Sequence, residues 1–223
     1  MAERHTVTLL MSEFVTRDVR RFVLTRPPGF TFEAGQGVEL AIKQTPWQDE
    51  PRPFTPTSLV DDGVLEFTIK RYPDHEGVTR ELHTLSPGAE LLMSEPFGTI
   101  SYQGPGVFLA GGAGITPFIA ILRERARASE LDRHTLIFSN KTPADIICEK
   151  ELRDYLGGRC ILTCTETSTP GYVQRRIDKA FLAEMIDDFD QHFYVCGPPG
   201  FMKAVNAALE DLGARPDSLV FER

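Results

Sequence analysis

The chain has 223 residues, of which 41% are hydrophobic and 25% are charged, and its formal net charge is -8 at pH 7. This composition is typical of a folded globular protein and excludes a disordered or fibrous chain, and the acidic balance argues against nucleic acid or an anionic membrane as the main partner. No apolar run is long enough to span a bilayer and the first residues include no apolar leader, so we expect a cytoplasmic protein without a membrane span.

Short β-like segments, separated by Gly, Pro and Asp, occupy the first half of the chain. The expected strands are Val7–Leu10, Val19–Thr25, Val38–Ile42, Phe54–Ser58, Val64–Arg71 and Glu90–Met93. A short helix, Thr79–Leu85, interrupts them. Short strands at close intervals with turn residues between them indicate an antiparallel barrel or sandwich.

Strands and helices alternate in the second half. The expected strands are Val107–Ala110, Thr135–Phe138, Cys160–Cys164, His192–Cys196 and Leu219–Phe221. The expected helices are Pro117–Ala128, Glu149–Leu156, Asp178–Met185 and Gly200–Leu212. This alternation predicts a doubly wound α/β fold with a five-stranded parallel sheet. We place the domain boundary at the Gly- and Pro-containing segment Gln103–Gly106, which gives domains of residues 1–102 and 103–223.

A glycine loop follows the first strand of the second half. It reads Gly111-Gly112-Ala113-Gly114-Ile115-Thr116-Pro117. Glycines allow the backbone to approach a pyrophosphate, and we expect Thr116 to be the N-cap and Pro117 the first residue of a helix whose N-terminus faces the anion. Because Pro117 stands where the dinucleotide fingerprint has its third glycine, an ordinary tight turn remains the alternative.

A second loop, Cys196-Gly197-Pro198-Pro199-Gly200, follows the fourth strand of this half. Loops at the carboxyl ends of parallel strands build the binding crevice, so the two loops meet if the first and fourth strands are neighbours. The Cys196 thiol could then contact a nicotinamide ring, and an inert buried cysteine is the alternative. Cys148, Cys160, Cys164 and Cys196 lack the spacing of a zinc or iron–sulfur site, and we expect no metal and no disulfide.

A polar segment in the first half has the residue types that a flavin requires. Arg52–Ser58 combines a guanidinium for a diphosphate, an aromatic ring for stacking and three hydroxyls. Further along, Lys70 precedes Gly77-Val78-Thr79 and the short helix, which suggests a second anion site. A polar strand and a solvated basic turn are the alternatives for these two segments.

The order of these motifs resembles that of the ferredoxin–NADP⁺ reductase superfamily, which includes cytochrome b5 reductases, flavodoxin reductases and the reductase components of oxygenases. Five matching segments cover nearly the whole chain: Phe32–Gly37, Arg52–Ser58, Gly77–Thr79, Pro96–Gly98, and the two glycine loops taken together. The departures are Ala34, Gly37 and Phe54, the last in place of a tyrosine, and an ending at Glu222-Arg223 without the family's final aromatic residue.

The resemblance implies an FAD-binding barrel followed by an NAD(P)H-binding sheet domain. By this resemblance, residues of the first half bind FAD: Arg52, Phe54, Thr55, Ser58, Lys70, Gly77, Val78 and Thr79. Residues of the second half bind the dinucleotide: Gly111, Gly112, Gly114, Ile115, Thr116, Pro117, Glu166, Cys196, Gly197 and Pro198. Thr116, Cys196 and Glu222 are the candidate catalytic residues where nicotinamide meets flavin.

The resemblance predicts an enzyme, an FAD-dependent NAD(P)H reductase that passes electrons to a small redox protein or a small molecule. Glu166 follows Cys160–Cys164 at the position expected to meet the adenosine ribose, and a carboxylate there favours NADH. Lys141, Arg175 and Arg176 could instead supply charge for NADPH.

Two other functions remain open. The chain could be the reductase subunit of a multi-component oxygenase, with Trp47 in the loop Gln44–Pro51 docking the partner or anchoring that loop. It could also be a non-catalytic nucleotide-binding sensor, although motifs in both halves argue against this.

Overall fold

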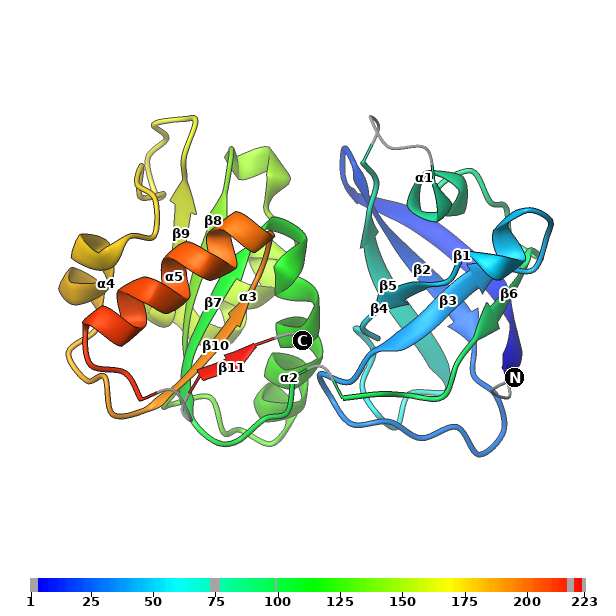
Figure 1. Ribbon diagram of the computed structural model, residues 1–223, viewed down its shortest axis with the longest axis horizontal. Coiled ribbons are helices and arrows are strands. Elements are labelled where there is room, and N and C mark those ends of the chain that lie inside the picture. The colour runs from blue at the N-terminus through cyan, green and yellow to red at the C-terminus, as the bar shows by residue number, and fades with distance from the viewer. Residues whose placement is uncertain (1–3, 73–76, 99, 216–218, 222–223) are drawn as a thin grey trace.

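The computed structural model describes residues 4–72, 77–98, 100–215 and 219–221. Within these residues the chain forms two sheets that lie side by side, one of six strands and one of five (Figure 1). The domain limits at residues 102 and 103 stay a prediction, but the first sheet ends with Met93 and the second begins with Gly106.

The first sheet is antiparallel at every pair of neighbouring strands. Its strands are β1 (His5–Thr16), β2 (Val19–Thr25), β3 (Val38–Ile42), β4 (Arg52–Phe54), β5 (Val64–Lys70) and β6 (Glu90–Met93), in the order β4-β3-β6-β1-β2-β5. A bridge between Pro56, just after β4, and Phe67 of β5 joins the two edges of this sheet. The barrel alternative of the sequence analysis is therefore the one that the chain adopts.

The barrel encloses its own apolar core. Alternate residues of β2, namely Phe22 and Leu24, point inward, as the period of a strand requires, and pack with Phe67 of β5. The short helix α1 (Val78–Leu82) buries Val78 and Leu82, which are one turn apart. Trp47 begins the 3-10 turn η1 (Trp47–Asp49) and packs, partly buried, against this core, so it anchors its loop.

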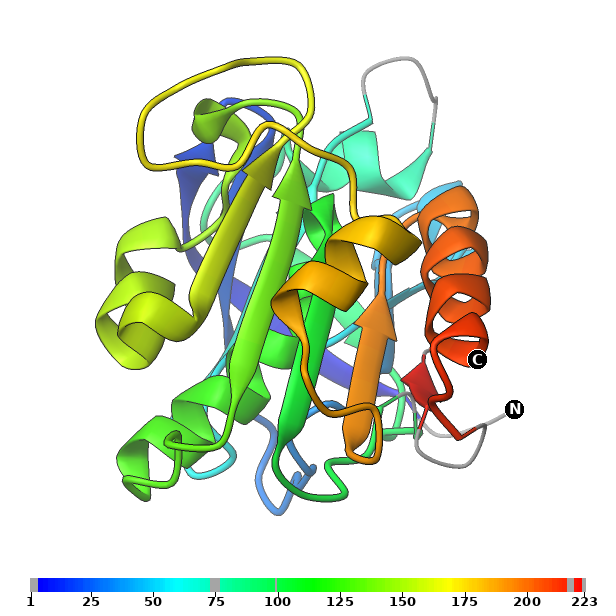
Figure 2. The ribbon, with the colours of Figure 1, turned by 90° about the vertical axis from the view of Figure 1, so that its left-hand side faces the viewer.

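The second sheet is parallel throughout, as predicted. Its strands are β7 (Gly106–Gly111), β8 (Thr135–Asn140), β9 (Cys160–Cys164), β10 (His192–Cys196) and β11 (Leu219–Phe221), in the order β11-β10-β7-β8-β9. Figure 2 shows these strands side by side, with α4 lying over the face turned to the viewer.

Helices cover both faces of this sheet because its strands are apolar on both sides. Helices α2 (Thr116–Arg127) and α3 (Glu149–Leu156) pack on one face, and α4 (Lys179–Met185) and α5 (Pro199–Asp211) on the other. Short 3-10 turns complete the second half: η2 (Gly112–Ile115), η3 (Pro143–Asp145) and η4 (Gly157–Arg159). No helix within the described residues combines the length and hydropathy that crossing a bilayer requires.

The connection between the sheets is held by one buried tyrosine. The Tyr194 hydroxyl of β10 accepts hydrogen bonds from the backbone N–H groups of Gln103 and Gly104, at 2.9 and 3.0 Å, and donates to the Gly104 carbonyl at 2.7 Å. Its ring stacks on that of Tyr102. All the hydrogen-bonding capacity of the hydroxyl is therefore used to fix the linker on the parallel sheet.

Candidate functional site

A cavity of about 580 Å³ lies between the two sheets, and we call it the junction cavity. The volume is typical of small-molecule sites, which measure roughly 300–1,000 Å³. Its lining consists of Arg52, Pro53, Phe54, Thr55, Thr68, Ile69, Lys70, Tyr72, Thr79, Gly111, Ala113, Gly114, Thr116, Pro117, Cys196, Gly197, Pro198 and Pro199. One wall is thus the barrel segment around β4 and β5, and the other is formed by the two glycine loops.

The two glycine loops are in direct contact because β10 is the neighbour of β7, where Cys196 pairs with Ala110. A Cβ atom added to Gly114 would lie 2.3 Å from the carbonyl oxygen of Cys196. A Cβ atom on Gly197 would lie 2.7 Å from the Phe201 ring. The same Cβ atom on Gly197 would lie 3.2 Å from the backbone N and Cα of Gly111, so each loop touches the backbone of the other and the predicted meeting of the two loops is confirmed.

The glycine loop enters α2 differently from the prediction. Gly112–Ile115 forms the 3-10 turn η2, and Thr116 is already the first helical residue, with φ −60° and ψ −44°. Its hydroxyl donates to the Ala113 carbonyl at 3.1 Å and caps no N–H group, so the assignment of Thr116 as N-cap and of Pro117 as the first helical residue is wrong. The 3-10 turn replaces the cap, because a tighter turn supplies the backbone contacts of the helix end.

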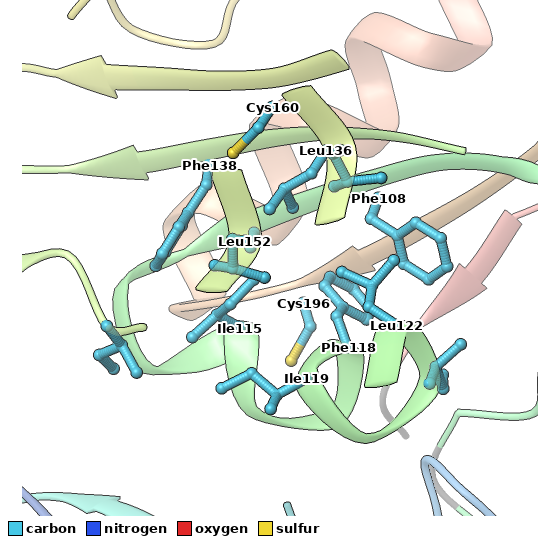
Figure 3. Close-up of a cluster of buried hydrophobic side chains, with 14 of the residues drawn as sticks. Phe108, Ile115, Phe118, Ile119, Leu122, Leu136, Phe138, Leu152, Cys160 and Cys196 are labelled. Carbon is cyan, nitrogen blue, oxygen red and sulfur yellow. The ribbon is translucent and has the colours of Figure 1, made fainter. Parts of the chain in front are cut away.

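Cys196 lines the junction cavity but is 97% buried. Its sulfur lies beside Ile119 and Phe118 of α2 (Figure 3). The side chain therefore packs on the helix that follows the glycine loop, and contact with a nicotinamide stays a prediction.

The barrel wall of the cavity presents side chains instead of backbone. The Arg52 guanidinium is half-exposed. It donates to the Pro51 carbonyl at 2.9 Å and to Glu50 at 3.5 Å, the two residues that precede it in the sequence. Phe54 is partly buried against the barrel core, and Thr55 is buried. This wall offers a cation, an aromatic ring and a hydroxyl within one short segment.

Ser58 does not reach the cavity. Its hydroxyl accepts a hydrogen bond from the N–H of Glu66 at 3.1 Å and is buried. The neighbouring Thr57 hydroxyl donates to Glu66 Oε1 at 2.9 Å. The structure therefore gives Ser58 a partner inside the barrel, and its proposed contact with a flavin stays a prediction.

A second cavity of about 450 Å³ adjoins the first, and we call it the sheet-edge cavity. The two share the lining residues Lys70, Tyr72, Gly111, Ala113 and Pro198. At its wall the Asn140 side chain, 93% buried at the carboxyl end of β8, has an Nδ2 donor without a hydrogen-bond partner. Buried donors are rarely left unpaired, so this one fits a polar ligand.

Charges of both signs surround the sheet-edge cavity. Arg17, from the turn between β1 and β2, reaches across to Asp145 at 3.1 Å, and Lys70 pairs with Asp18 at 3.1 Å. The hydrogen bonds from Thr142 lower the pKa of Asp145, although burial opposes them. With Lys141, three basic residues line the cavity against two acidic ones, which suits an anionic ligand.

Glu166 lies next to this cavity without lining it. Its carboxylate is 3.4 Å from Lys141 Nζ, and both side chains are largely exposed. Arg175 is engaged elsewhere, since it contacts Glu184 at 2.6 Å. Lys141 is therefore the candidate cation that forms an ion pair with Glu166 in the described structure.

Most predicted site residues line one of the two cavities. The junction cavity is lined by Arg52, Phe54, Thr55, Lys70, Thr79, Gly111, Gly114, Thr116, Pro117, Cys196, Gly197 and Pro198, and Gly112 lines the sheet-edge cavity. The side chains of Val78 and Ile115 are buried in the cores, and Gly77 and Ser58 line neither cavity. Glu222 lies outside the described residues.

Sequence reasoning missed several lining residues, among them Asn140, Thr68 and Arg17. Asn140 ends a parallel strand, and this position alone could have identified it. Thr68 looks like an ordinary strand residue, and Arg17 belongs to a β-turn, so no local signal distinguishes them.

Three cysteines are held as neutral thiols by the fold. Burial raises the pKa of Cys148 and of Cys160 to about 11 each, and it also raises the pKa of Cys164. Because the thiolate is the reactive form, these residues are poor nucleophiles at neutral pH. Across residues 4–72, 77–98, 100–215 and 219–221, no three His, Cys, Asp or Glu side chains are grouped so as to hold a metal ion.

The two cavities fit a flavin and a dinucleotide. A Cβ atom on Gly112, which has φ +53°, would meet no heavy atom within 4 Å, so ligand space lies open above the loop. The orphaned Asn140 donor, the Arg52 guanidinium and the half-buried Phe54 ring supply polar and aromatic contacts around that space.

The comparisons with known proteins agree with this geometry. Residues 6–102 match the family model of the oxidoreductase FAD-binding domain, and residues 108–207 match that of the oxidoreductase NAD-binding domain. NADH-cytochrome b5 reductase 1 of Coccidioides immitis is 30% identical over 226 residues, which cover 91% of this chain and 72% of that protein.

Two further relatives extend the comparison. The reductase component of propane 2-monooxygenase from Rhodococcus jostii (strain RHA1) is 25% identical over 95% of this chain, which spans 61% of that protein's length. A crystal structure of a ferredoxin NADP⁺ reductase from Neisseria gonorrhoeae with bound FAD and NADP superposes with a TM-score of 0.83 at 21% identity, covering 96% of this chain and 93% of that one. The chain belongs to the ferredoxin–NADP⁺ reductase-like family of FAD- and NAD-binding oxidoreductases.

Proposed function

We propose that this protein is an FAD-dependent reductase that takes electrons from NADH and passes them to a redox acceptor. The observation that supports this most directly is the junction cavity. This cavity of about 580 Å³ is lined on one side by the segment Arg52–Thr55 and on the other by the loops that begin at Gly111 and Cys196. A hydride donor and a hydride acceptor bound to the two walls would meet there.

On the nucleotide side, the chain would bind the dinucleotide through its backbone. The N–H groups of Gly112–Ile115 and the N-terminus of α2 attract an anion, and the glycines keep Cβ atoms out of the way. The Asn140 amide, at the sheet-edge cavity, would donate to a polar group of the same ligand.

On the flavin side, Arg52 would hold the diphosphate with its planar guanidinium, and Phe54 would pack against the isoalloxazine ring. Thr55 would hydrogen-bond the ring edge. When bound, FAD accepts the hydride of the nicotinamide and releases electrons singly or in pairs.

The protein's own contribution at the junction is position and exclusion of water. Thr116, fixed by its hydrogen bond to Ala113, and Cys196, fixed by its packing on α2, shape the nucleotide wall. Both would limit where the nicotinamide ring lies, which is how such sites lower the barrier to transfer.

We assign NADH rather than NADPH as the donor on the basis of Glu166. Its carboxylate would accept a hydrogen bond from a free 2′-hydroxyl and repel a 2′-phosphate. Lys141 is 3.4 Å from this carboxylate, so its charge is partly neutralised.

A second candidate is the reductase subunit of a multi-component oxygenase. The similarity to a propane 2-monooxygenase reductase component over 95% of this chain favours it. In that case the acceptor is a protein that approaches the exposed edge of the cavity at Arg52 and Pro53.

Anaerobic mixing with NADH tests the proposed activity. Purified protein reconstituted with FAD should show the yellow flavin spectrum, and NADH should bleach it within seconds to minutes. Steady-state rates with ferricyanide and with cytochrome c then report transfer to a small-molecule and to a protein acceptor, each of which takes one electron at a time.

The outcomes separate the candidates. Flavin binding without bleaching by NADH or NADPH contradicts the reductase, and a protein that binds nucleotide but no flavin supports the sensor instead. Bleaching by NADH with slow turnover on small acceptors favours a dedicated protein acceptor.

A further inference from the structure

Helix α2 carries a partly buried arginine two turns after the glycine loop. Arg123 is 17% exposed, and its guanidinium donates four hydrogen bonds. Nη1 donates to the Thr57 carbonyl at 2.6 Å and to Glu66 Oε1 at 2.7 Å. Nε and Nη2 donate to the two carboxylate oxygens of Glu151 at 2.6 and 3.0 Å.

These partners belong to different halves of the molecule. Thr57 and Glu66 are in the barrel, and Glu151 is in α3 of the parallel-sheet half. Glu66 also accepts from the Thr57 hydroxyl at 2.9 Å, so one carboxylate holds both Arg123 and Thr57. Thr57 lies two residues after Thr55, which lines the junction cavity, and the contact therefore holds the segment that continues from the barrel wall.

The cluster is a partly buried network of charges. Burial pushes the pKa of Arg123 down, but the hydrogen bonds and charges of Glu151 and Glu66 outweigh it and raise that pKa. In the same way burial pushes the pKa of Glu151 up, and the hydrogen bonds from Arg123 outweigh it and lower that pKa. Arg123 is therefore a cation and Glu151 a carboxylate at neutral pH. Removing Arg123 takes from Glu151 its ion pair at 2.6 Å, whereas Glu66 keeps Arg21 at 3.5 Å.

A second arginine of α2 provides a natural contrast. Arg127, one turn further along, also reaches the barrel and contacts Asp61 at 2.6 and 2.7 Å. Both of these side chains are more than half exposed, at 58% and 56%. An exposed pair of this kind is screened by water and contributes little to holding two domains together.

We propose that Arg123 is a positioning residue that fixes α2, and with it the glycine loop at its start, against the Arg52–Thr57 segment of the barrel. The two walls of the junction cavity are then held at one separation by a contact outside the cavity. The consequence for electron transfer depends on the proposed function, whereas the consequence for domain coupling does not.

Five variants separate the two sets of contacts. Arg123→Gln removes all of them, Glu66→Gln weakens the barrel contact, and Glu151→Gln weakens the contact within the parallel-sheet half. Arg127→Gln is the matched control on the same helix. Arg123→Lys keeps the charge but loses the planar fork, so we expect its effects to be intermediate.

Calorimetry and small-angle scattering of the protein without nucleotide test the coupling. We expect Arg123→Gln and Glu66→Gln to split one unfolding transition into two and to broaden the distribution of distances between the halves. Glu151→Gln should lower the midpoint of a transition that stays single, and Arg127→Gln should resemble the wild type.

Stopped-flow reduction by NADH tests the effect on electron transfer. Arg123→Gln and Glu66→Gln should slow flavin bleaching at least tenfold at saturating NADH, with unchanged flavin content, and Glu151→Gln should slow it less than threefold. If all three variants slow reduction equally and unfold in one transition, Arg123 only stabilises the fold and the proposal is wrong.

The two proposals fail in different ways. A wild-type protein that NADH does not reduce contradicts the proposed function, while calorimetry and scattering still decide the role of Arg123. If Arg123→Gln does not fold, Arg123→Lys and Glu66→Gln supply the same comparison with Glu151→Gln.

Discussion

The two walls of the junction cavity are built from different parts of the chain. The nucleotide wall is backbone, with Gly114 packed so closely on Cys196 that an added Cβ would lie 2.3 Å from a carbonyl oxygen. The barrel wall is made of side chains. Within the described residues, the Arg52 guanidinium donates hydrogen bonds only to Glu50 and Pro51. One wall is formed by the fold itself, while the other gains its main contacts from a ligand. Changes in the first should therefore damage folding and binding together, and changes in the second should damage binding alone.

Gly114→Ala should have the largest effect. The new methyl group cannot fit against Cys196, so the two glycine loops must separate. We expect dinucleotide affinity to fall more than about 100-fold and the free energy of unfolding to fall by about 1–3 kcal/mol, as for other overpacked sites. Titration with NAD⁺ and chemical unfolding measure the two effects.

Gly200→Ala is the matched control for this substitution. Gly200 is the last residue of the second loop and lies in the first turn of α5, and a Cβ atom there would meet nothing within 4 Å. Alanine favours a helix over glycine by up to about 1 kcal/mol, so this variant should be as stable as the wild type or more so. Equal losses in both variants would contradict the close contact at Gly114.

Arg52→Ala should weaken flavin binding and leave the fold intact. Its guanidinium is half-exposed and makes no contact with a distant part of the chain in the described structure. A charge-assisted hydrogen bond contributes about 1.5–3 kcal/mol, so FAD affinity should fall roughly 10- to 100-fold. The flavin-to-protein ratio after gel filtration and the FAD dissociation constant measure this.

Arg52→Lys sharpens the same comparison. It keeps the charge without the bidentate geometry, so its FAD affinity should lie between those of the wild type and Arg52→Ala. The thermal midpoint of the flavin-free protein should be the same in all three. A lower midpoint in Arg52→Ala would mean that the barrel wall, too, is formed by the fold.

Glu166→Gln should shift the choice of nicotinamide nucleotide. Without the carboxylate, Lys141 is available to a 2′-phosphate, since these two side chains are 3.4 Å apart. We expect the ratio of kcat/KM for NADH to that for NADPH to fall about tenfold. Lys141→Ala should raise the ratio, and Glu184→Gln, which alters the pair with Arg175, should not change it.

The contrast between the walls also explains what the sequence could predict. The bounds of Cys160–Cys164 and Glu149–Leu156 are predicted correctly because local pattern determines them. Glycine loops are equally visible, since few residues other than glycine allow such contacts. The predicted start of α2, at Pro117, is one residue too late. The 3-10 turn before Thr116 replaces the side-chain cap that the local sequence favours.

Long-range contacts leave no such local signal. In the sequence, Arg123 is an ordinary basic residue of an amphipathic helix. Only the packing of the two halves places it within hydrogen-bond distance of Glu66 and Thr57. The Ser58 motif suggests a ligand contact, but the Ser58 hydroxyl accepts from the N–H of Glu66 on the neighbouring strand β5, and only the pairing of these two segments shows this.

Each half also contains a buried histidine. Through these two residues, low pH should reduce the free energy of unfolding of both halves, and we expect this to be the smallest of the predicted effects. Burial lowers the pKa of His83 in the barrel and of His134 in the parallel-sheet half below 6.5. The positive charge of the nearby Arg20 also lowers the pKa of His83. In addition, Nδ1 of His83 has no hydrogen-bond partner, so a proton added there would have no acceptor. Between the folded-state pKa and 6.5 the unfolded chain binds more protons than the folded one, so stability falls as the pH is lowered through this window.

His83→Gln and His134→Gln measure the two contributions separately. Each histidine contributes at most about 1.4 kcal/mol per pH unit, and removing one should reduce the loss of unfolding free energy between pH 7.5 and 5.5. Chemical unfolding at the two pH values gives this loss for each variant. If the halves are coupled as Arg123 suggests, either substitution makes the whole protein less sensitive to acid. If each variant protects only its own half, the halves unfold independently and the coupling is absent.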